Sequence, residues 1–377
     1  MKILIDARLL SKGNSSGIEE YTKLLIDNIL NIDEVNTYEF FTNGLLKSAL
    51  PKEWMTKAVV HSWSLPNKIF DVSAKFLNFP KIDSCLKFDL VFSPHFNNLP
   101  LKNTPRILTI HDLSFIHHPD FFSKRHKFWH YFQDIKKQIN NAQMIIADSD
   151  FTKNDLINTL GISEEKIKRI YPGLSDKFKK ISPSEIVLEK YKIKKPYLLY
   201  LGTIEPRKNV SSVVAAFNIL KSGKFKESFK ELNLVIAGQR GWLYEDVIKK
   251  INSSEHRKNI ILTGKVENED RVDIYNGAAV FVYPSFFEGF GFPSLEAQAC
   301  GIPVVASNRT SLGELLGSSA LLVDPWRVGD LAHAVEEILV NLNWQMYLVS
   351  SGFNNIKRFS WKKTAKDLIS IFNKFHL

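Results

Sequence analysis

Short apolar runs of strand length alternate along this chain with segments in which apolar residues recur at helical spacing. The first pair consists of an apolar run at residues 2–7 and a segment at residues 18–29 in which apolar side chains recur three and four positions apart. This alternation predicts an α/β fold built on parallel, doubly wound sheets. The expected strands are residues 2–7, 38–42, 89–93, 106–114, 142–149, 196–202, 234–238, 260–266, 280–284 and 304–306.

The pattern changes after residue 175, where the apolar repeats stop, lysines become frequent and prolines occur. Such a composition is typical of a linker between domains. A chain of 377 residues is long enough to bury two cores. We therefore predict an N-terminal Rossmann-like domain at residues 1–175 and a C-terminal Rossmann-like domain at residues 190–357.

Two local expectations concern the N-terminal domain. Asp150 is expected to cap the helix that follows the strand at 142–149, because an Asp side chain can accept a hydrogen bond from the first free amides. The aromatic residues in the region before residue 80 are expected to belong mainly to the core, and no specific role is assigned to them. They are Trp54, Trp63, Phe70, Phe76 and Phe79.

The composition, 44% hydrophobic and 24% charged, is ordinary for a soluble globular protein. The two cysteines, Cys85 and Cys300, lie outside any metal-ligand spacing, which argues against a disulfide framework and fits a reducing compartment. The N-terminal segment reaches Asp6 too early for a signal peptide, and no run of about 18 apolar residues predicts a membrane span. We therefore expect a cytoplasmic protein.

The net charge of +10 is concentrated in two short segments. Residues 176–195 carry seven lysines against three acidic residues, and residues 357–377 carry six lysines and arginines against one acidic residue. These are either ordinary solvated side chains or a source of attraction to anionic lipid head groups or a pyrophosphate-linked acceptor. The second interpretation predicts peripheral contact with the inner face of the cell membrane. No nucleic-acid-binding signature accompanies the charge, so no nucleic-acid partner is expected.

One buried-type strand is followed by a glycine loop and a short helix. Gly289 and Gly291 leave backbone amides uncovered, and Pro293 suits the first helical position, where its missing N–H is not needed. A bare loop that leads into a helix N-terminus favours an anion. Because a phosphate there needs no carboxylate, Glu288 and Glu296 are expected to bind hydroxyls. An anion and a polyol at one strand end indicate a nucleotide-sugar.

Two further strand ends carry candidate chemistry. Arg207 and Lys208 share one short loop, where Arg can bind phosphate oxygens in a bidentate manner and Lys acts as a point charge. In the N-terminal half a predicted strand delivers His111 and Asp112 to its carboxyl end, where ligands bind in open α/β sheets. The nearby pair His117–His118 has no further ligand at zinc spacing, so no metal site is predicted.

These stretches resemble the family-4 retaining glycosyltransferases of the two-domain GT-B fold. The signature of that family is two glutamates with seven residues between them, followed by a Cys-Gly-x-Pro-Val-Val run, and Glu288, Glu296 and residues 300–305 are similar to it. Residues 107–123 look most like bacterial mannosyltransferases. The resemblance covers nearly the whole chain. It implies two Rossmann-like domains that face a cleft, with the C-terminal helix, in residues 358–377, crossing back to the N-terminal domain.

The resemblance also implies residue roles. His111 would contact the donor sugar near the reacting centre, Arg207 and Lys208 would clamp the donor phosphates, and Glu288 would lie at the sugar end. The implied catalytic residues are His111, Arg207, Lys208 and Glu288. The implied donor-binding residues are Gly17, Gly202, Thr203, Val266, Gly289, Phe290, Gly291, Phe292 and Glu296, with Asp112 as a further candidate. The pair Glu19–Glu20 departs from the family, which often has an arginine there.

The implied activity is metal-independent, retaining transfer of a hexose from a nucleoside-diphosphate sugar to a glycan or lipid-linked acceptor in surface polysaccharide synthesis. GDP-mannose is the favoured donor, UDP-linked hexoses stay open, and no cofactor or metal is expected. Two other functions also stay open. One is a non-catalytic GT-B scaffold that binds a nucleotide-sugar. The other is a nucleotide-sugar epimerase, although the second acidic and histidine cluster that it would need is not evident in the sequence.

Overall fold

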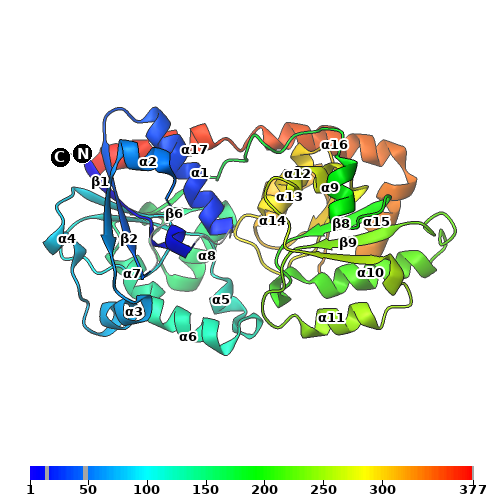
Figure 1. The fold of residues 1–377 in the computed structure, drawn as a ribbon, viewed down its shortest axis with the longest axis horizontal. Helices are drawn as coiled ribbons and strands as arrows, with labels where there is room; N and C mark the ends of the chain where they lie inside the picture. Colours follow the sequence, from blue (N-terminus) through cyan, green and yellow to red (C-terminus); the bar gives the residue numbers. More distant parts are fainter. Residues whose placement is uncertain (13–16, 46–49, 376–377) are drawn as a thin grey trace. The chain divides into compact units, whose positions relative to one another are not determined.

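The computed structural model describes residues 1–12, 17–45 and 50–375, which form two compact α/β units (Figure 1). Each unit is built around one sheet, and every strand pair in the described part of the chain is parallel. Unit 1 comprises Met1–His117, Lys124–Gly173 and Phe359–Leu377, and unit 2 comprises His118–Ser123 and Leu174–Arg358.

Unit 1 contains the strands β1 (Lys2–Asp6), β2 (Thr37–Asn43), β3 (Val59–Trp63), β4 (Leu90–Ser93), β5 (Arg106–Ile110), β6 (Met144–Ala147) and β7 (Ile167–Arg169). Over the described residues their order in the sheet is β3-β2-β1-β4-β5-β6-β7. The strands β4 and β5 are buried along their whole length, as expected for parallel strands covered by helices on both faces. The strand order reverses between β1 and β4, because β2 and β3 are added on one side of β1 and β4 on the other.

The helices of unit 1 are amphipathic segments that cover this sheet. In the first of them, Tyr21, Leu25 and Ile29 lie on the buried face at helical spacing. The α-helices are α1 (Gly17–Ile32), α2 (Lys52–Lys57), α3 (Asn67–Phe76), α4 (Ile82–Cys85), α5 (Ser114–His117), α6 (Lys124–Gln133), α7 (Ile135–Asn141), α8 (Asp150–Leu160) and α17 (Trp361–Phe372).

Unit 2 contains the strands β8 (Tyr197–Leu201), β9 (Asn233–Ala237), β10 (Ile260–Gly264), β11 (Val280–Tyr283), β12 (Val304–Ser307) and β13 (Leu321–Val323). Their order, over the residues that the structure describes, is β10-β9-β8-β11-β12-β13. The order therefore reverses between β8 and β11. In open α/β sheets such a reversal leaves a crevice at the carboxyl ends of the strands, where ligands bind.

The helices of unit 2 are α9 (Glu185–Lys190), α10 (Val210–Ser222), α11 (Glu245–Asn252), α12 (Arg271–Asn276), α13 (Phe292–Ala299), α14 (Ser311–Leu316), α15 (Val328–Val340) and α16 (Leu342–Ile356). The helix α13 begins at Phe292, one residue before the Pro293 that the sequence indicated as its start. Among the helices in the described ranges, none has the length and apolar character that crossing a membrane requires.

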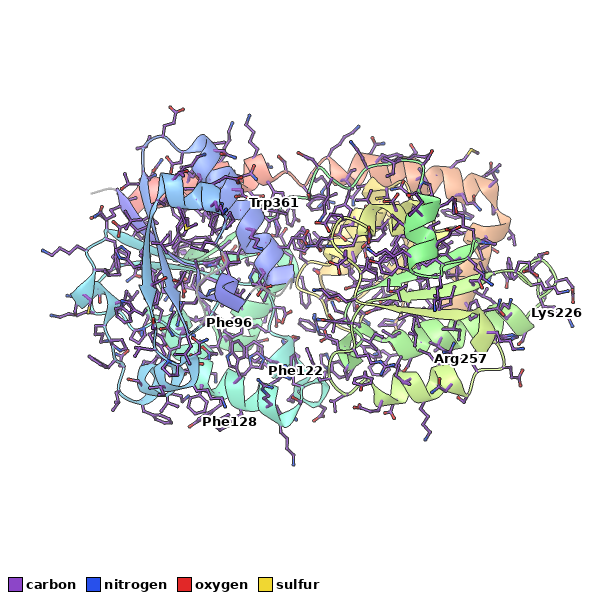
Figure 2. All side chains as sticks on the ribbon, viewed as in Figure 1. Phe96, Phe122, Phe128, Lys226, Arg257 and Trp361 are labelled. Atoms are coloured by element: carbon purple, nitrogen blue, oxygen red, sulfur yellow. The ribbon has the colours of Figure 1, made fainter. Side chains whose placement is uncertain are left out.

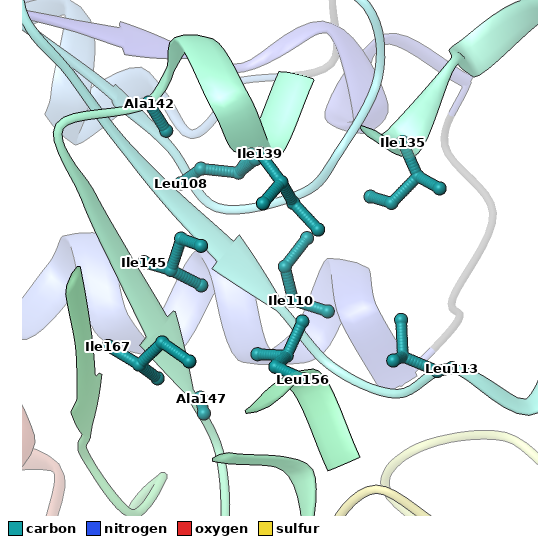
Figure 3. Close-up of a cluster of buried hydrophobic side chains, with 10 residues drawn as sticks. All are labelled: Leu108, Ile110, Leu113, Ile135, Ile139, Ala142, Ile145, Ala147, Leu156 and Ile167. Atoms are coloured by element: carbon teal, nitrogen blue, oxygen red, sulfur yellow. The ribbon is translucent and has the colours of Figure 1, made fainter. Parts of the chain in front are cut away.

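An apolar cluster fixes the carboxyl ends of two strands in unit 1 (Figure 3). Leu108 and Ile110 of β5 and Ile145 of β6 are fully buried against Ile139 of α7 and Leu156 of α8. Full burial of each such side chain contributes about 1.5–3 kcal/mol. The carboxyl ends of β5 and β6 are therefore rigid, and they fix the positions of the residues that follow them.

The last helix returns to the N-terminal unit. The ring of Trp361, at the start of α17, lies 5.7 Å from that of Tyr21 of α1, measured between ring centroids, and the Thr364 hydroxyl donates to the Tyr171 carbonyl at 2.7 Å. The α/β class, the two Rossmann-like sheets and the return of the C-terminal helix are thereby confirmed.

The predicted cap of α8 was wrong by one residue. Ser149 is the N-cap: its backbone is extended, with φ −149° and ψ 162°, and its Oγ accepts from the Thr152 amide at 3.1 Å. Asp150 is already the first helical residue, where a carboxylate still complements the helix dipole.

The aromatic residues before residue 80 are only partly core. Trp54 and Phe70 are buried, whereas Phe76 and Phe79 are each 61% exposed. The reason is helical geometry, because α3 buries the face that carries Phe70 and Ala74, and Phe76 lies on another face. This part of unit 1 therefore presents apolar rings to solvent.

The close approach of Gly173 to α17 generates a stability prediction. A Cβ added at Gly173 would lie 2.1 Å from the backbone nitrogen of Trp361, so Gly173→Ala must displace the start of α17. We expect a loss of about 1–3 kcal/mol, which is typical of overpacking, and a lower midpoint in scanning calorimetry. In the control Gly329→Ala no atom lies within 4 Å of the added Cβ, so the midpoint should change little. Equal midpoints for the two variants would contradict the described packing of α17.

Candidate functional site

The candidate site of unit 2 lies where the loops after β8 and β11 meet. Because these two strands are neighbours, the carboxyl end of β8 places Arg207 and Lys208 beside the loop that begins after Tyr283 of β11. The Phe286 amide donates to the Arg207 carbonyl at 2.9 Å, which ties the two loops together. The site is thus assembled at the reversal point of the sheet.

Four charged side chains form one cluster in this site, in which the two carboxylates are buried and the two cations are half-buried. The Lys208 ammonium donates to Glu288 Oε1 at 2.6 Å, and the Arg207 guanidinium donates to Glu288 Oε2 at 3.3 Å. The same guanidinium donates through Nε and Nη2 to Glu205 Oε1, at 3.2 and 3.0 Å. The two cations and two carboxylates balance in charge, so Arg207 and Lys208 are oriented before any ligand arrives.

Burial and charge act in opposite directions on this cluster. Burial by itself raises the pKa of Glu288, but the Lys208 and Arg207 cations outweigh it and hold the pKa below its ordinary value. Burial lowers the pKa of Lys208, and the adjacent Arg207 cation lowers it further, against the opposing effect of Glu288. Lys208 also donates to the Tyr283 hydroxyl at 2.8 Å. The cluster therefore keeps Glu288 ionised in a nearly water-free setting.

The glycine loop before α13 is held from behind by two hydroxyl side chains. The Glu288 amide donates to the Thr310 hydroxyl at 3.1 Å, and the Ser311 hydroxyl donates to the carbonyls of Glu288 and Phe290 at 2.9 and 3.2 Å. Gly291 has φ +94°, and a Cβ there would lie 2.5 Å from Leu312. Only glycine fits both this backbone and this space. Gly291 is the N-cap of α13 and has a left-handed backbone, and the second helical residue, Pro293, has no N–H to leave unsatisfied.

Glu296 lies one turn into α13 and is buried. Its Oε2 accepts from the Tyr275 hydroxyl at 2.7 Å and from the Arg271 guanidinium. Burial raises the pKa of Tyr275 well above its ordinary value, and the Glu296 charge raises it further, so this hydroxyl stays a donor. The Glu296 carboxylate therefore has a fixed orientation, and a carboxylate of this kind retains lone pairs for further donors.

The other predicted donor-binding residues of unit 2 border the same edge. Gly202 and Thr203 follow β8, and the Tyr200 hydroxyl donates to the Thr203 carbonyl at 3.1 Å. Gly238 packs its backbone against Gly202, since a Cβ at Gly238 would lie 2.0 Å from the Gly202 carbonyl oxygen. Val266 is half-buried two residues after β10.

The remaining predicted residues belong to unit 1. His111 and Asp112 follow β5, and Asp112 Oδ1 accepts from the Ser114 amide and hydroxyl at 2.9 and 2.6 Å, which caps α5. His111 Nδ1 lies 2.6 Å from Asp148 Oδ2. Gly17 is the exposed first residue of α1, and the preceding residues 13–16 of the predicted loop lie outside the described ranges.

The structure thus gathers one group of predicted residues in unit 2 and another in unit 1. Three residues that hold the predicted residues in place were not predicted from the sequence: Glu205, Thr310 and Asp148. Glu205 stands two positions before Arg207 and was within reach of local reasoning. Thr310 and Asp148 come from other strand ends, and no local signal marks them. In the described part of the chain no group of three or more His, Cys, Asp and Glu residues is placed to hold a metal ion.

Comparison with known proteins identifies this arrangement. The model of the family described as glycosyl transferases group 1 matches residues 185–352, and the model of Glycosyltransferase Family 4 matches residues 41–178. The O-antigen chain mannosyltransferase B of Escherichia coli is 32% identical over 279 residues, which are 73% of this chain and 71% of the relative.

Solved structures share the fold at low sequence identity. Sucrose-phosphate synthase from Thermosynechococcus elongatus has a TM-score of 0.78 at 18% identity, covering 100% of this chain and 99% of that one. Anabaena HepE in complex with UDP and glucose has a TM-score of 0.72 at 18% identity, covering 99% of both chains. Together with the E. coli relative, these likenesses confirm the family predicted from the sequence. The chain belongs to the family-4 glycosyltransferases of the GT-B fold.

Proposed function

We propose that this glycosyltransferase transfers mannose, with retention of configuration, from GDP-mannose to a glycan or lipid-linked acceptor during the synthesis of a surface polysaccharide. The observation that carries the proposal is the cluster of Arg207, Lys208 and Glu288 at the reversal point of the unit 2 sheet. The E. coli relative is named an O-antigen chain mannosyltransferase, which supports both the sugar and the product class.

In this proposal the donor diphosphate binds between two cations and the start of α13. Arg207 and Lys208 supply charge and hydrogen-bond donors, and the start of α13 adds the positive end of its helix dipole. Gly17 of unit 1 is proposed as a further donor-binding residue. These groups are rigid before binding, so little reorganisation is needed when charge develops on the leaving nucleotide.

The two glutamates of the family signature would address hydroxyl groups. Glu296, held by Arg271 and Tyr275, would accept from the ribose hydroxyls, and Glu288 would accept from the sugar. Gly202, Thr203 and the amides of residues 289–292 would border the sugar and phosphates, and the backbone at Val266 would contact the base. His111 and Asp112 would contribute from unit 1.

The chemical step separates an anionic leaving group from a sugar that acquires positive charge. Arg207 and Lys208 would stabilise the departing diphosphate without a metal ion. In the proposed retaining step the acceptor attacks from the leaving-group face, and a donor phosphate oxygen takes the acceptor proton. The protein's share is then electrostatic stabilisation and alignment of the two substrates.

Two other functions are less well supported. A non-catalytic scaffold is not indicated by the E. coli and Salmonella relatives, which are named mannosyltransferases. Conversion of the free nucleotide-sugar, as in an epimerase, is not indicated by the mannosyltransferase relative.

Removal of either cation should impair transfer without unfolding the protein. We expect Arg207→Ala and Lys208→Ala each to lower kcat by about 100-fold or more, the typical effect of removing one preorganised charge-stabilising group. Initial rates of transfer from a radiolabelled donor would measure this. Lys249→Ala, at an exposed position of α11, is the matched control and should retain the wild-type rate. Full activity in both site variants would contradict the assignment of Arg207 and Lys208 to the donor phosphates.

The donor is tested directly by a panel of GDP- and UDP-linked hexoses. GDP-mannose should give the largest increase in the thermal unfolding midpoint and the fastest transfer, because binding to the folded state alone stabilises it by mass action. A larger response to UDP-glucose would instead favour a UDP-sugar donor, the nucleotide and sugar present in the HepE complex. Label that moves into another free nucleotide-sugar would indicate epimerisation, and binding without turnover would indicate a scaffold.

We further infer contact with an anionic membrane surface. The sequence pointed to the basic segments 176–195 and 357–377, but in the first segment Lys190 is paired with Asp270 and Lys195 with Glu185, each at 2.6 Å. Another surface combines charge with apolar rings. It is the α3–α6 face, which consists of Ile69, Val72, Phe76, Phe128, Trp129 and Tyr131, all at least one third exposed.

The α3–α6 face matches the chemistry of a lipid surface. Figure 2 shows Phe128 on α6, where it is 64% exposed, and the ring of Phe132 links α6 to Phe76 of α3 at 6.0 Å between centroids. The two helices carry Lys68, Lys124, Arg125 and Lys127 against Asp71, and their fifth basic residue, Lys75, is paired with Asp134 at 3.4 Å. Aromatic rings among lysines and arginines are typical of helices that lie in the head-group region of anionic bilayers.

Vesicle binding tests this contact. Wild-type protein should cosediment with vesicles of phosphatidylcholine and phosphatidylglycerol, and more weakly at high salt. The double variant Phe76→Ser/Phe128→Ser should bind at least about tenfold more weakly, because two apolar side chains no longer leave water. The control Lys362→Gln/Lys363→Gln/Lys366→Gln, on the exposed face of α17, should lose less. The reverse order would place the contact on the basic tail, and no binding at all would refute it.

A further inference from the structure

We propose that Asp148 is a positioning residue that holds His111 as a doubly protonated imidazolium, and that glycosyl transfer depends on this form of the ring. The sequence assigned His111 to the donor sugar and gave Asp148 no role. The catalytic half of the inference rests on the proposed function, whereas the protonation state can be measured without any substrate.

Each ring nitrogen of His111 has a hydrogen-bond partner. Nε2 lies 2.9 Å from the Pro94 carbonyl oxygen, which can only accept a hydrogen bond, so Nε2 carries a proton. Nδ1 lies 2.6 Å from Asp148 Oδ2. The residues come from three neighbouring strand ends, because Pro94 follows β4, His111 follows β5 and Asp148 follows β6.

The setting favours a proton on Nδ1 as well. Asp148 is buried, and its second oxygen, Oδ1, has no hydrogen-bond partner among the described residues, so His111 is the group that neutralises this carboxylate. The other groups around the ring are Asp112 after β5, His95 after β4 and Tyr21 of α1, whose ring meets that of His111 edge-on at 4.8 Å. Of these, the Asp112 charge favours the cation, whereas His95 would disfavour it only if His95 were itself protonated.

The net electrostatic effect supports the same state. Burial by itself lowers the pKa of His111, but the Asp148 charge, the hydrogen bonds to Asp148 and Pro94, and the Asp112 charge outweigh it and raise the pKa. Burial also lowers the pKa of His95 to about 4, so His95 is neutral at neutral pH and does not repel the imidazolium. The cation at His111 is therefore stabilised relative to an ordinary histidine and is lost as the pH rises through this raised pKa.

This protonation state restricts what the ring can do. An imidazolium has no lone pair, so His111 cannot act as a general base toward the acceptor hydroxyl. It can offer a substrate oxygen a charge-assisted N–H donor, stronger than that of a neutral ring, at the nitrogen that now donates to Pro94. Asp148 acts through His111 by fixing the orientation and charge of the ring.

The protonation state is tested by NMR of protein labelled with ¹⁵N in histidine, with His111→Gln used to assign the His111 signals. Wild-type His111 should show two protonated ring nitrogens at pH 7 and should titrate above the ordinary pKa of about 6.5. In Asp148→Asn, which keeps the side-chain shape and removes the charge, the titration should move down by at least one pH unit. A wild-type His111 that titrates at or below the ordinary value overturns the inference, whether or not transfer is detected.

The role in transfer is tested by the pH dependence of kcat. At pH 7.5, Asp148→Asn should lower kcat, by up to about tenfold for a downward shift of one pKa unit, because such a shift reduces the cationic fraction by at most tenfold, and it should regain activity as the pH is lowered toward 6. Asp155→Asn is the matched control, since Asp155 contacts His117 of the same unit at 2.6 Å, outside the proposed site. Its pH profile should equal that of the wild type.

The protonation state of His111 and its role in transfer can fail independently. An Asp148→Asn profile that is indistinguishable from the wild-type profile overturns the positioning role. If no donor supports transfer by the wild-type protein while His111 is cationic, the proposed function fails and the assigned protonation state is upheld.

Discussion

The pairing of Arg207 and Lys208 with one buried carboxylate is the constraint on which the donor site of unit 2 depends. Two adjacent cations would repel each other and turn toward solvent, but Glu288 accepts from both and Glu205 fixes Arg207 from the other side. The pairing spans about 80 residues of chain and exists because β8 and β11 are neighbours in the sheet. Arg207 and Lys208 therefore have fixed orientations in the absence of any ligand.

Buried polar side chains are also paired at the carboxyl ends of the strands in unit 1. Within the sheet, β5 and β6 are held by apolar packing around Ile110 and Ile145 (Figure 3). At the carboxyl ends of the strands lie buried polar pairs, such as the bidentate contact of Arg8 with Asp6 and the contact of His111 with Asp148. Since an unpaired buried charge is costly, these pairs are stable only while the strand ends keep their spacing, and the apolar cluster supplies that rigidity.

Much of the architecture could be predicted from the sequence because buried parallel strands and glycine loops leave local signals. The run at 280–284 and Gly291 with its positive φ are of this kind. Side-chain partners that come from distant strand ends leave no such signal, which is why Asp148 and Thr310 were missed. Phe76 was expected in the core because its residue type fits a core equally well, and only the docking of α3 through Phe70 exposes it.

The choice of donor base is also not marked by a local sequence signal. Every contact proposed for the phosphates and ribose uses charges, backbone amides or the carboxylate of Glu296, and these features of a nucleoside diphosphate are the same whichever base it carries. Arg271 and Tyr275 fix Glu296 in a similarly base-independent way. In the proposed function, discrimination between guanine and uracil would then have to arise elsewhere, and the loop after β10, near Val266, is the segment proposed to contact the base.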